Sequence, residues 1–426
     1  MARFEAALAR ACAEAGIVPR GDAEVLASAC ERAHFEAAQL AREAREAGTL
    51  AIPFVKSLTR QVAAVSEQAS RHVHLGATSQ DVMDTALVLC LREAAAHIAG
   101  LARRLGDALA ALAERYRDTP LAGRTLLQPA LPVPFGWKAA GWLSMLARSQ
   151  AHFRAAAAEN AVLQFGGAAG TLSAYGTEGH RVASALAAAL GLQLPPISWH
   201  SARDRLARLG AASAVLTGAA ARIARDVSLL MQPEIGEAAE PSAPGRGGSS
   251  SLPHKRNPAA CLLALEAAQR SPGLVATLLS QLTPEHERGL GQWQAQWFTL
   301  RELLGASASA LASMAQVAEG LQVFPEAMQV NLERTRGLVY SEAVSLRLSR
   351  EIGKQAAHAL TEKLCAEALR RAASLEEVAR SDPEVARIVP PRELAELFRP
   401  QVAFGTASTM TDAALAEWRA ARDAAT

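Results

Sequence analysis

A chain of 426 residues is too long for a single compact core, so we expect two or three domains. Hydrophobic residues make up 50% of it, which argues against disorder, and the formal net charge of +2 provides no overall field for nucleic acid or a membrane surface. The five cysteines are scattered and include no CxxC pair, which argues against a disulfide framework or a zinc site and indicates a reducing cytoplasm.

The N-terminal sequence MARFEAALARACAEAG has the pattern of an amphipathic helix that contains acidic residues. A signal peptide would instead have an apolar centre. No apolar run is expected to reach the length of a membrane span. The sequence therefore predicts a cytoplasmic protein with neither a membrane nor a nucleic acid as partner.

Helical periodicity dominates the next part of the chain. Apolar residues between Leu87 and Tyr116 recur at steps of three and four, which predicts a helix of about 30 residues, roughly 45 Å long. Two further long helices are expected, over residues 137–163 and 258–282. Strand-like alternation is nearly absent, so we expect an all-α fold with a central bundle of long helices. A seven-residue spacing predicts a seam of that bundle at Leu209, Leu216, Ile223 and Leu230.

The order of these patterns predicts three domains. An N-terminal helical domain covers residues 1–80, the central bundle covers 81–336 and carries a loop at 242–258, and a C-terminal helical domain covers 337–426. Polar loops of an α-helical bundle are where a site is assembled. The candidate segments are 72–80, 118–136, 164–171, 195–205 and 240–258.

One of these loops, GRGGSSSLPHKRNP at 245–258, has the composition of an anion-binding site. Its glycines permit backbone conformations that direct several N–H groups at one point. Asn257 and Pro258 predict the start of a helix, with Asn257 as the cap and Lys255 beside the positive end of the helix dipole.

Three blocks of the sequence resemble the fumarase/aspartase superfamily. GSSSLPHKRNP (248–258) is similar to that superfamily's signature GSSxMPxKxNP, with Leu252 in place of Met. HLGATSQDVMDT (74–85) and GRTLLQPALPVPFG (123–136) resemble its first and second conserved regions, in the same order. The resemblance implies an all-α subunit of three domains. It also implies a homotetramer in which each active site gathers loops from three subunits.

Further segments narrow the resemblance: LQFGGAAGTLSA (163–174), WHSARDR (199–205) and PEHERGLGQWQAQW (284–297). They are similar to the bacterial 3-carboxy-cis,cis-muconate cycloisomerases, and the resemblance runs from residue 1 to about 410. The resemblance implies conversion of 3-carboxy-cis,cis-muconate, a small tricarboxylate, to 4-carboxymuconolactone in the protocatechuate branch of the β-ketoadipate pathway. It implies no cofactor and no metal. His72 and His74 form an HxH pair, but no third ligand follows at a telling spacing.

The resemblance also implies roles for particular residues. Ser249 matches the catalytic serine, and Lys255 is the second catalytic candidate. Arg288 is a candidate cation for a substrate carboxylate. Contact of His200, Arg246 or His286 with substrate is left open. The substrate-binding candidates are His74, Thr78, Ser79, Arg124, Thr125, Asn257 and Arg288.

The chain departs from the superfamily's lyases at three places. The second block has Leu126 where the lyases usually have a His that protonates the leaving group. Ala202 stands before RDR where the lyases have Gln. Family members also carry a further stretch before FEAALARA, and two expectations stay open: that the true start lies upstream of residue 1, or that a lid segment of the first domain is missing.

Leu126 favours lactone formation over a lyase reaction. In the reverse reaction the leaving group is a carboxylate, which ionises near pH 4 and needs no acid to protonate it. Two alternatives stay open: a fumarate-releasing lyase such as adenylosuccinate lyase, and a catalytically silent structural protein like the lens crystallins of this superfamily.

Overall fold

The computed structural model describes residues 1–242, 245 and 247–423. Contacts within the chain divide it into two compact units. The first unit consists of Met1–Ala99, His152–Ala214 and Arg270–Gly305. The second consists of Gly100–Ala151, Val215–Gln269 and Ala306–Thr426. The three predicted domains have different boundaries and stay a prediction.

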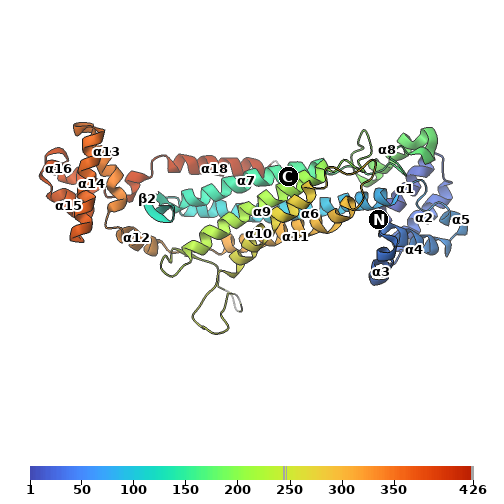
Figure 1. The fold of residues 1–426 in the computed structure, drawn as a ribbon, viewed down its shortest axis with the longest axis horizontal. Coiled ribbons are helices and arrows are strands. Elements are labelled where there is room, and N and C mark those ends of the chain that lie inside the picture. The colour runs from blue at the N-terminus through green and yellow to red at the C-terminus, as the bar shows by residue number, and fades with distance from the viewer. Residues whose placement is uncertain (243–244, 246, 424–426) are drawn as a thin grey trace. The chain divides into compact units, whose positions relative to one another are not determined.

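Long helices dominate the fold and confirm the all-α prediction (Figure 1). The apolar face predicted between Leu87 and Tyr116 lies in the 37-residue α6, where Ile98, Leu105 and Leu109 are fully buried. The seven-residue seam lies in α9 and is buried at all four positions. Each of the long helices contributes residues to both units: α6 (Ser79–Arg115), α7 (Phe135–Glu159), α9 (Asp204–Leu230), α10 (Ala259–Leu279) and α11 (Gln292–Glu319).

By length and composition alone, α6 is apolar enough to cross a membrane. Its sequence also contains polar side chains that are buried against protein, among them Gln80, Asp81 and Asp84. A membrane-spanning segment would leave such charged groups without these partners. We therefore assign α6 as a core helix.

The N-terminal helices of the first unit pack against one another. Helix α1 contacts α2 and α8, and the apolar residues Phe4, Leu8 and Leu26 are buried there. This unit contains α1 (Ala2–Glu14), α2 (Arg20–Arg32), α3 (Ala37–Ala47), α4 (Ala51–Ala63), α5 (Glu67–Ser70), the 3-10 helix η1 (Ser173–Glu178) and α8 (Gly179–Leu190).

The C-terminal helices of the second unit have an apolar cluster of their own, which includes Val344, Leu348 and Leu375. Short helices form because prolines and capping residues interrupt the chain, as Asp382 does where it caps α16. The elements are α12 (Pro325–Glu333), η2 (Leu338–Tyr340), α13 (Ser341–Ile352), α14 (Lys354–Arg371), α15 (Leu375–Ser381), α16 (Pro383–Ile388), α17 (Pro391–Glu396), η3 (Pro400–Ala403) and α18 (Ala407–Asp423).

The second unit also contains strands that the sequence patterns did not predict. The segment expected as a loop at 118–136 holds an antiparallel hairpin of β1 (Pro120–Thr125) and β2 (Gln128–Pro134). Thr125 pairs with Gln128, so only Leu126 and Leu127 form the turn. A second, very short pair joins β3 (Ala238–Ala239) to β4 (Gln322–Val323).

A buried ion pair joins separate segments of the first unit. The Asp84 carboxylate on α6 accepts hydrogen bonds from Arg203 Nη1 at 2.6 Å and Nη2 at 3.0 Å, and from Trp293 Nε1 on α11 at 2.9 Å. Arg203 Nε donates in turn to Gln296 Oε1 at 2.8 Å. Both charged side chains are almost completely buried, so each depends on the other for its charge compensation.

Gly76 allows a close approach in the turn before α6. Its φ of +67° lies in the left-handed region, and a Cβ atom there would lie 2.5 Å from the Tyr175 ring. The Tyr175 hydroxyl donates to the carbonyl oxygen of Leu75. A side chain at position 76 would therefore displace the tyrosine that holds this turn.

We expect Asp84→Ala to lower the free energy of unfolding by about 3–5 kcal/mol, because it leaves the Arg203 guanidinium buried without a counter-charge. As a control, Glu24→Ala breaks the exposed Arg10–Glu24 pair and should cost at most about 1 kcal/mol. Denaturant unfolding measures both. Equal losses of unfolding free energy in the two variants would show that the buried Asp84–Arg203 pair contributes no more to stability than an exposed pair.

We expect Gly76→Ala to destabilise the protein by at least about 1–2 kcal/mol, from the left-handed backbone alone, with the Tyr175 clash in addition. Gly141→Ala is the matched control, because Gly141 lies inside α7 with open space around its Cβ direction. That control should be neutral or more stable by roughly 0.5–1 kcal/mol. Thermal unfolding distinguishes the two, and a stable Gly76→Ala variant would contradict the packing described.

Candidate active site

The first conserved block lies at the start of α6, in the first unit. Thr78 precedes the helix, and its backbone N–H donates to Asp81 Oδ2 at 3.0 Å, one half of a capping box. The hydroxyls of Thr78 and Ser79 have no hydrogen-bond partner among the residues that the structure describes. Both residues are half-buried. They are thus available to an anion at the positive end of a long helix.

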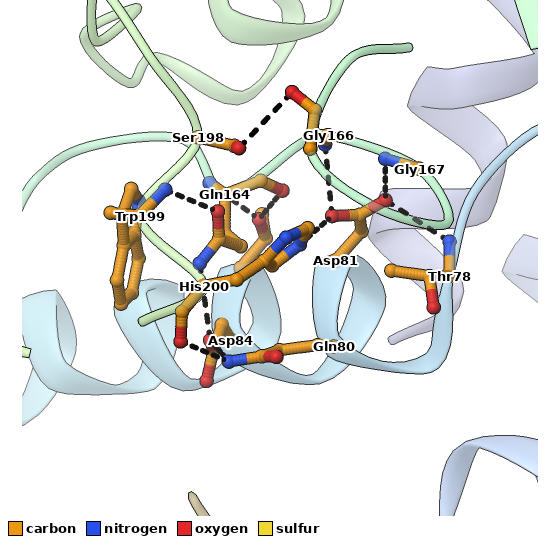
Figure 2. A network of polar contacts seen from close by, with 12 residues as sticks. Thr78, Gln80, Asp81, Asp84, Gln164, Gly166, Gly167, Ser198, Trp199 and His200 are labelled. Carbon is orange, nitrogen blue, oxygen red and sulfur yellow. Dashed lines mark hydrogen bonds and ion pairs between the residues drawn. The ribbon is translucent and has the colours of Figure 1, made fainter. Parts of the chain in front are cut away.

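The Asp81 carboxylate is the centre of this region (Figure 2). It accepts hydrogen bonds from the backbone N–H of Gly166 at 3.0 Å and Gly167 at 2.9 Å, and lies 2.7 Å from His200 Nε2. Asp81 is fully buried. One carboxylate therefore fixes Thr78, the segment 164–171 and the segment 195–205 relative to one another.

Gln80 connects the same helix to Arg288. Its side-chain amide donates to Asp84 Oδ2 at 3.1 Å and to the His200 carbonyl at 2.8 Å. Its oxygen accepts from Arg288 Nε at 2.9 Å. Arg288 Nη2 also donates to the Ala168 carbonyl at 3.3 Å, while the side chain stays exposed. Through Gln80, His200 and Asp81, Arg288 thus belongs to the same hydrogen-bond network as the Thr78 backbone N–H.

His74 is held by a buried glutamate from α1. Its Nδ1 lies 2.7 Å from Glu5 Oε1, and its backbone N–H donates to Glu5 Oε2 at 3.0 Å. Burial on its own would lower the pKa of His74. The hydrogen bond and charge of Glu5, with the charge of Asp81, outweigh this and raise the pKa above its ordinary value. These two acids therefore stabilise the imidazolium form of His74 more than bulk water does.

The signature loop lies in the second unit and is closed at its base. The Asn257 N–H donates to the Gly247 carbonyl at 2.7 Å. Gly247 has φ +69°, and a Cβ there would lie 2.4 Å from the Asn257 carbonyl oxygen, so a side chain does not fit. Asn257 Nδ2 also approaches the Gly248 carbonyl at 3.4 Å. The residues between these two positions form a closed loop.

Ser249 lies within this loop and is half-buried. Its Oγ accepts hydrogen bonds from the backbone N–H of Leu252 at 3.1 Å and of Ser251 at 3.4 Å. Amide donors of this kind stabilise negative charge on the oxygen. Lys255 is exposed. Arg246 lies outside the described residues.

The predicted cap of α10 is wrong. The helix begins at Ala259, and the carboxylate of Glu240, not the side chain of Asn257, accepts the N–H groups of Ala260 at 3.1 Å and Cys261 at 2.7 Å. Glu240 is almost completely buried, and its two oxygens take up donors that the start of a helix leaves unpaired.

The β1–β2 hairpin positions the second block. Arg124 pairs with the fully buried Glu237, Nη1 to Oε2 at 2.8 Å and Nη2 to Oε1 at 2.7 Å. Asn331 Nδ2 also donates to Glu237 Oε1 at 2.8 Å. Arg124 therefore has a structural partner, which the sequence-based assignment to substrate did not foresee. Thr125 is exposed.

The tip of this hairpin is apolar and strained. Leu126 and Leu127 have φ values of +50° and +66°, a conformation that usually requires Gly, Asn or Asp in a two-residue turn. Their side chains are 97% and 76% exposed. Among the described residues, little packs against these two apolar side chains, so burial within the chain does not offset the backbone strain.

The predicted site residues thus fall into two groups, one in each unit. His74, Thr78, Ser79 and Arg288 belong to the first unit, and Arg124, Thr125, Ser249, Lys255 and Asn257 to the second. Their roles stay predictions. Of the three residues left open, His200 is buried beside Asp81 and His286 is exposed with φ +48°.

The HxH pair, His72 and His74, lies in the turn before α6 in the first unit. Its two histidines face different acids: His72 Nε2 lies 3.5 Å from Asp22, and His74 lies against Glu5. Among the described residues, no group of three or more His, Cys, Asp or Glu side chains could hold a metal ion.

Sequence reasoning overlooked Glu5, Gln80, Asp81 and Asp84. Asp81 carried a signal, because an acid three residues after a threonine at a helix start is typical of a cap. Glu5 carried none, since its partner lies 69 residues away.

Two families match the chain. The family described as Lyase matches residues 1–273, and the family described as Adenylosuccinate lyase C-terminus matches residues 337–414. The first match alone covers more than half of the chain.

Several proteins of known name are similar over nearly the full length. A 3-carboxy-cis,cis-muconate cycloisomerase of Pseudomonas aeruginosa is 47% identical, over 99% of this chain and 92% of that protein. A nitrosuccinate lyase of Streptomyces davaonensis is 39% identical, over 97% of this chain and 89% of that protein. The crystal structure of the 3-carboxy-cis,cis-muconate lactonizing enzyme from Pseudomonas putida matches with a TM-score of 0.94 at 41% identity, covering 99% of this chain and 94% of that one. The chain belongs to the fumarase/aspartase family of lyases.

Proposed function

We propose that this protein is a cytoplasmic, cofactor-independent 3-carboxy-cis,cis-muconate cycloisomerase of the protocatechuate branch of the β-ketoadipate pathway. The observation that carries the proposal is the near full-length similarity to cycloisomerases of several bacteria, together with Leu126 at the second-block position. Family members have other activities as well, so the assignment rests on the chemistry of these residues in addition to similarity.

The reaction forms one C–O bond and one C–H bond. A carboxylate oxygen of the substrate adds to an alkene carbon, the neighbouring carbon takes up a proton, and a lactone results. In the reverse direction a proton leaves the carbon next to a carboxylate, and the ring oxygen departs as a carboxylate. Negative charge accumulates on the carboxylate beside the carbanion, so the site must supply cations and N–H donors.

The two groups of residues suit this requirement. In the first unit, the free hydroxyls of Thr78 and Ser79 at the start of α6 and the exposed guanidinium of Arg288 would bind substrate carboxylates. In the second unit, Ser249 would transfer the proton, with its oxygen supported by two amides and by the cation of Lys255.

The active sites are proposed to form in a homotetramer, each from loops of three subunits. The apolar hairpin tip supports this, because Leu126 and Leu127 are exposed at a cost in backbone strain and would be covered by substrate or another subunit. Large apolar side chains on and near α10 and α11 are also exposed: Leu262, Leu263, Leu279, Leu290 and Phe298.

A second candidate is a lyase that releases fumarate or a related alkene. It is favoured by the 39% identity to a nitrosuccinate lyase. Leu126 speaks against any such reaction in which a poor leaving group must be protonated, because a leucine side chain carries no proton to donate.

Ultraviolet absorbance of purified protein with three substrates tests the proposal. The absorbance of 3-carboxy-cis,cis-muconate should disappear as its conjugation is lost, whereas nitrosuccinate and adenylosuccinate should yield no fumarate. Ser249→Ala should lower the rate by at least about 100-fold with unchanged helical content. Ser250→Ala, an exposed hydroxyl of the same loop, should retain activity. Fumarate production from nitrosuccinate or adenylosuccinate, or no reaction with any of the three substrates, would overturn the proposal.

Leu126→His tests why the histidine of the lyases is missing here. We expect no acceleration of muconate turnover and no new ionisation in the pH–rate profile, because the departing carboxylate needs no acid. Leu126→Ala should only remove an apolar contact, with a loss of roughly 1–3 kcal/mol in kcat/KM. A faster Leu126→His enzyme whose rate titrates near the pKa of histidine would refute this explanation.

A further inference from the structure

The Glu5–His74 pair has features that a packing role does not require. Glu5 is 1% exposed and engages His74 twice, through the ring nitrogen at 2.7 Å and the backbone N–H at 3.0 Å. Both Glu5 oxygens therefore act as acceptors, which is the role of a carboxylate. The opposite ring nitrogen, Nε2, has no hydrogen-bond partner among the described residues.

The backbone at His74 is held in an unusual conformation. Its φ of +57° lies in the left-handed region, which a residue with a side chain occupies at a cost. The neighbouring Gly76 and Tyr175 fix the same turn from the other side. Glu5 thus orients the His74 imidazole, and His74 lies in the turn that immediately precedes Thr78, Ser79 and the start of α6.

We propose that Glu5 is a positioning residue: it holds one His74 proton on Nδ1, so that the second proton of the imidazolium lies on Nε2, from which it is donated to a carboxylate of the substrate. This inference rests on the proposed function, since it concerns the binding of that tricarboxylate. A carboxylate cannot donate, so the neutral ring must carry its proton on the nitrogen that faces Glu5. When the ring is protonated, Nε2–H becomes a charged donor toward the substrate.

The sign of the pH dependence follows from the neighbouring groups. Glu5 on α1 and Asp81 on α6 both favour the charged ring. Burial raises the pKa of Cys12 to about 11, and it raises that of Tyr175 as well, so neither gains charge near neutral pH. His74 therefore binds an anion most strongly below its own raised pKa, and the contribution is lost as pH rises through that value.

Selective nitrogen-15 labelling of histidine tests the arrangement without any reaction. The His74 signals, assigned with His74→Gln, should show a raised pKa and, above it, a neutral ring protonated on Nδ1. Binding of propane-1,2,3-tricarboxylate, measured by calorimetry, should weaken as pH rises through that pKa. A neutral ring protonated on Nε2 would overturn the inference, and this measurement on the unaltered protein does not depend on any variant folding.

Glu5→Gln tests the role of the carboxylate. It should lower the pKa of His74 and weaken tricarboxylate binding by roughly tenfold or more at neutral pH. KM for the muconate should rise with little change in kcat, as expected when a binding contact is lost. The matched control is Asp22→Asn, which removes the carboxylate 3.5 Å from the neighbouring His72 and should change none of these.

An unchanged His74 pKa in Glu5→Gln, or equal effects of the two variants, would overturn the inference. Failure of the proposed reaction is a separate outcome, because the labelled histidine and the calorimetry report on His74 even if muconate is not turned over.

Discussion

Two buried carboxylates on one turn of α6 organise the first unit. Placing a carboxylate away from water costs several kcal/mol unless hydrogen bonds or an opposite charge compensate it. Asp81 is compensated by three backbone amides and the ring of His200, and Asp84 by Arg203 and the Trp293 indole. Gly166 and Gly167 lie in the loop at 164–171, and His200 lies in the loop at 195–205. Their hydrogen bonds to Asp81 therefore fix both loops against the start of α6. The position of the hydroxyls at Thr78 and Ser79 depends on that geometry.

Periodicity was sufficient to predict long helices such as α6 and α9, and it did not indicate the hairpin or the partners that lie far apart in the sequence. The buried faces of α6 and α9 follow directly from the spacing of their apolar residues. The β1–β2 hairpin was missed because its turn is Leu126–Leu127 and lacks the Gly, Asn or Asp that marks such a turn. The cap of α10 was assigned to Asn257 from local preference, whereas Glu240, about twenty residues earlier, occupies that position.

In the candidate site as well, local sequence patterns indicated the segments but not the partners that lie far apart in the sequence. Motif similarity identified the segments that carry Thr78, Ser249 and Arg288, but no local pattern indicated that Arg124 would pair with Glu237 or that Glu5 would hold His74. Such pairs are set by tertiary packing between residues far apart in sequence. These pairs change the chemistry expected of Arg124 and His74. The Arg124 guanidinium already has a carboxylate partner, and the charge of Glu5 favours the protonated form of His74.

The exposed hairpin tip has a consequence for how the folded chain responds to substitution at position 126. Since the Leu126 side chain makes so little contact within the folded chain, replacing it removes almost no packing energy, and its φ of +50° favours Gly, Asn or Asp over other residues. The buried carboxylate clusters have the opposite property, because each donor depends on the others. A substitution at the tip can therefore leave the folded chain intact, whereas one in a carboxylate cluster exposes its remaining partners to the cost of an uncompensated buried charge.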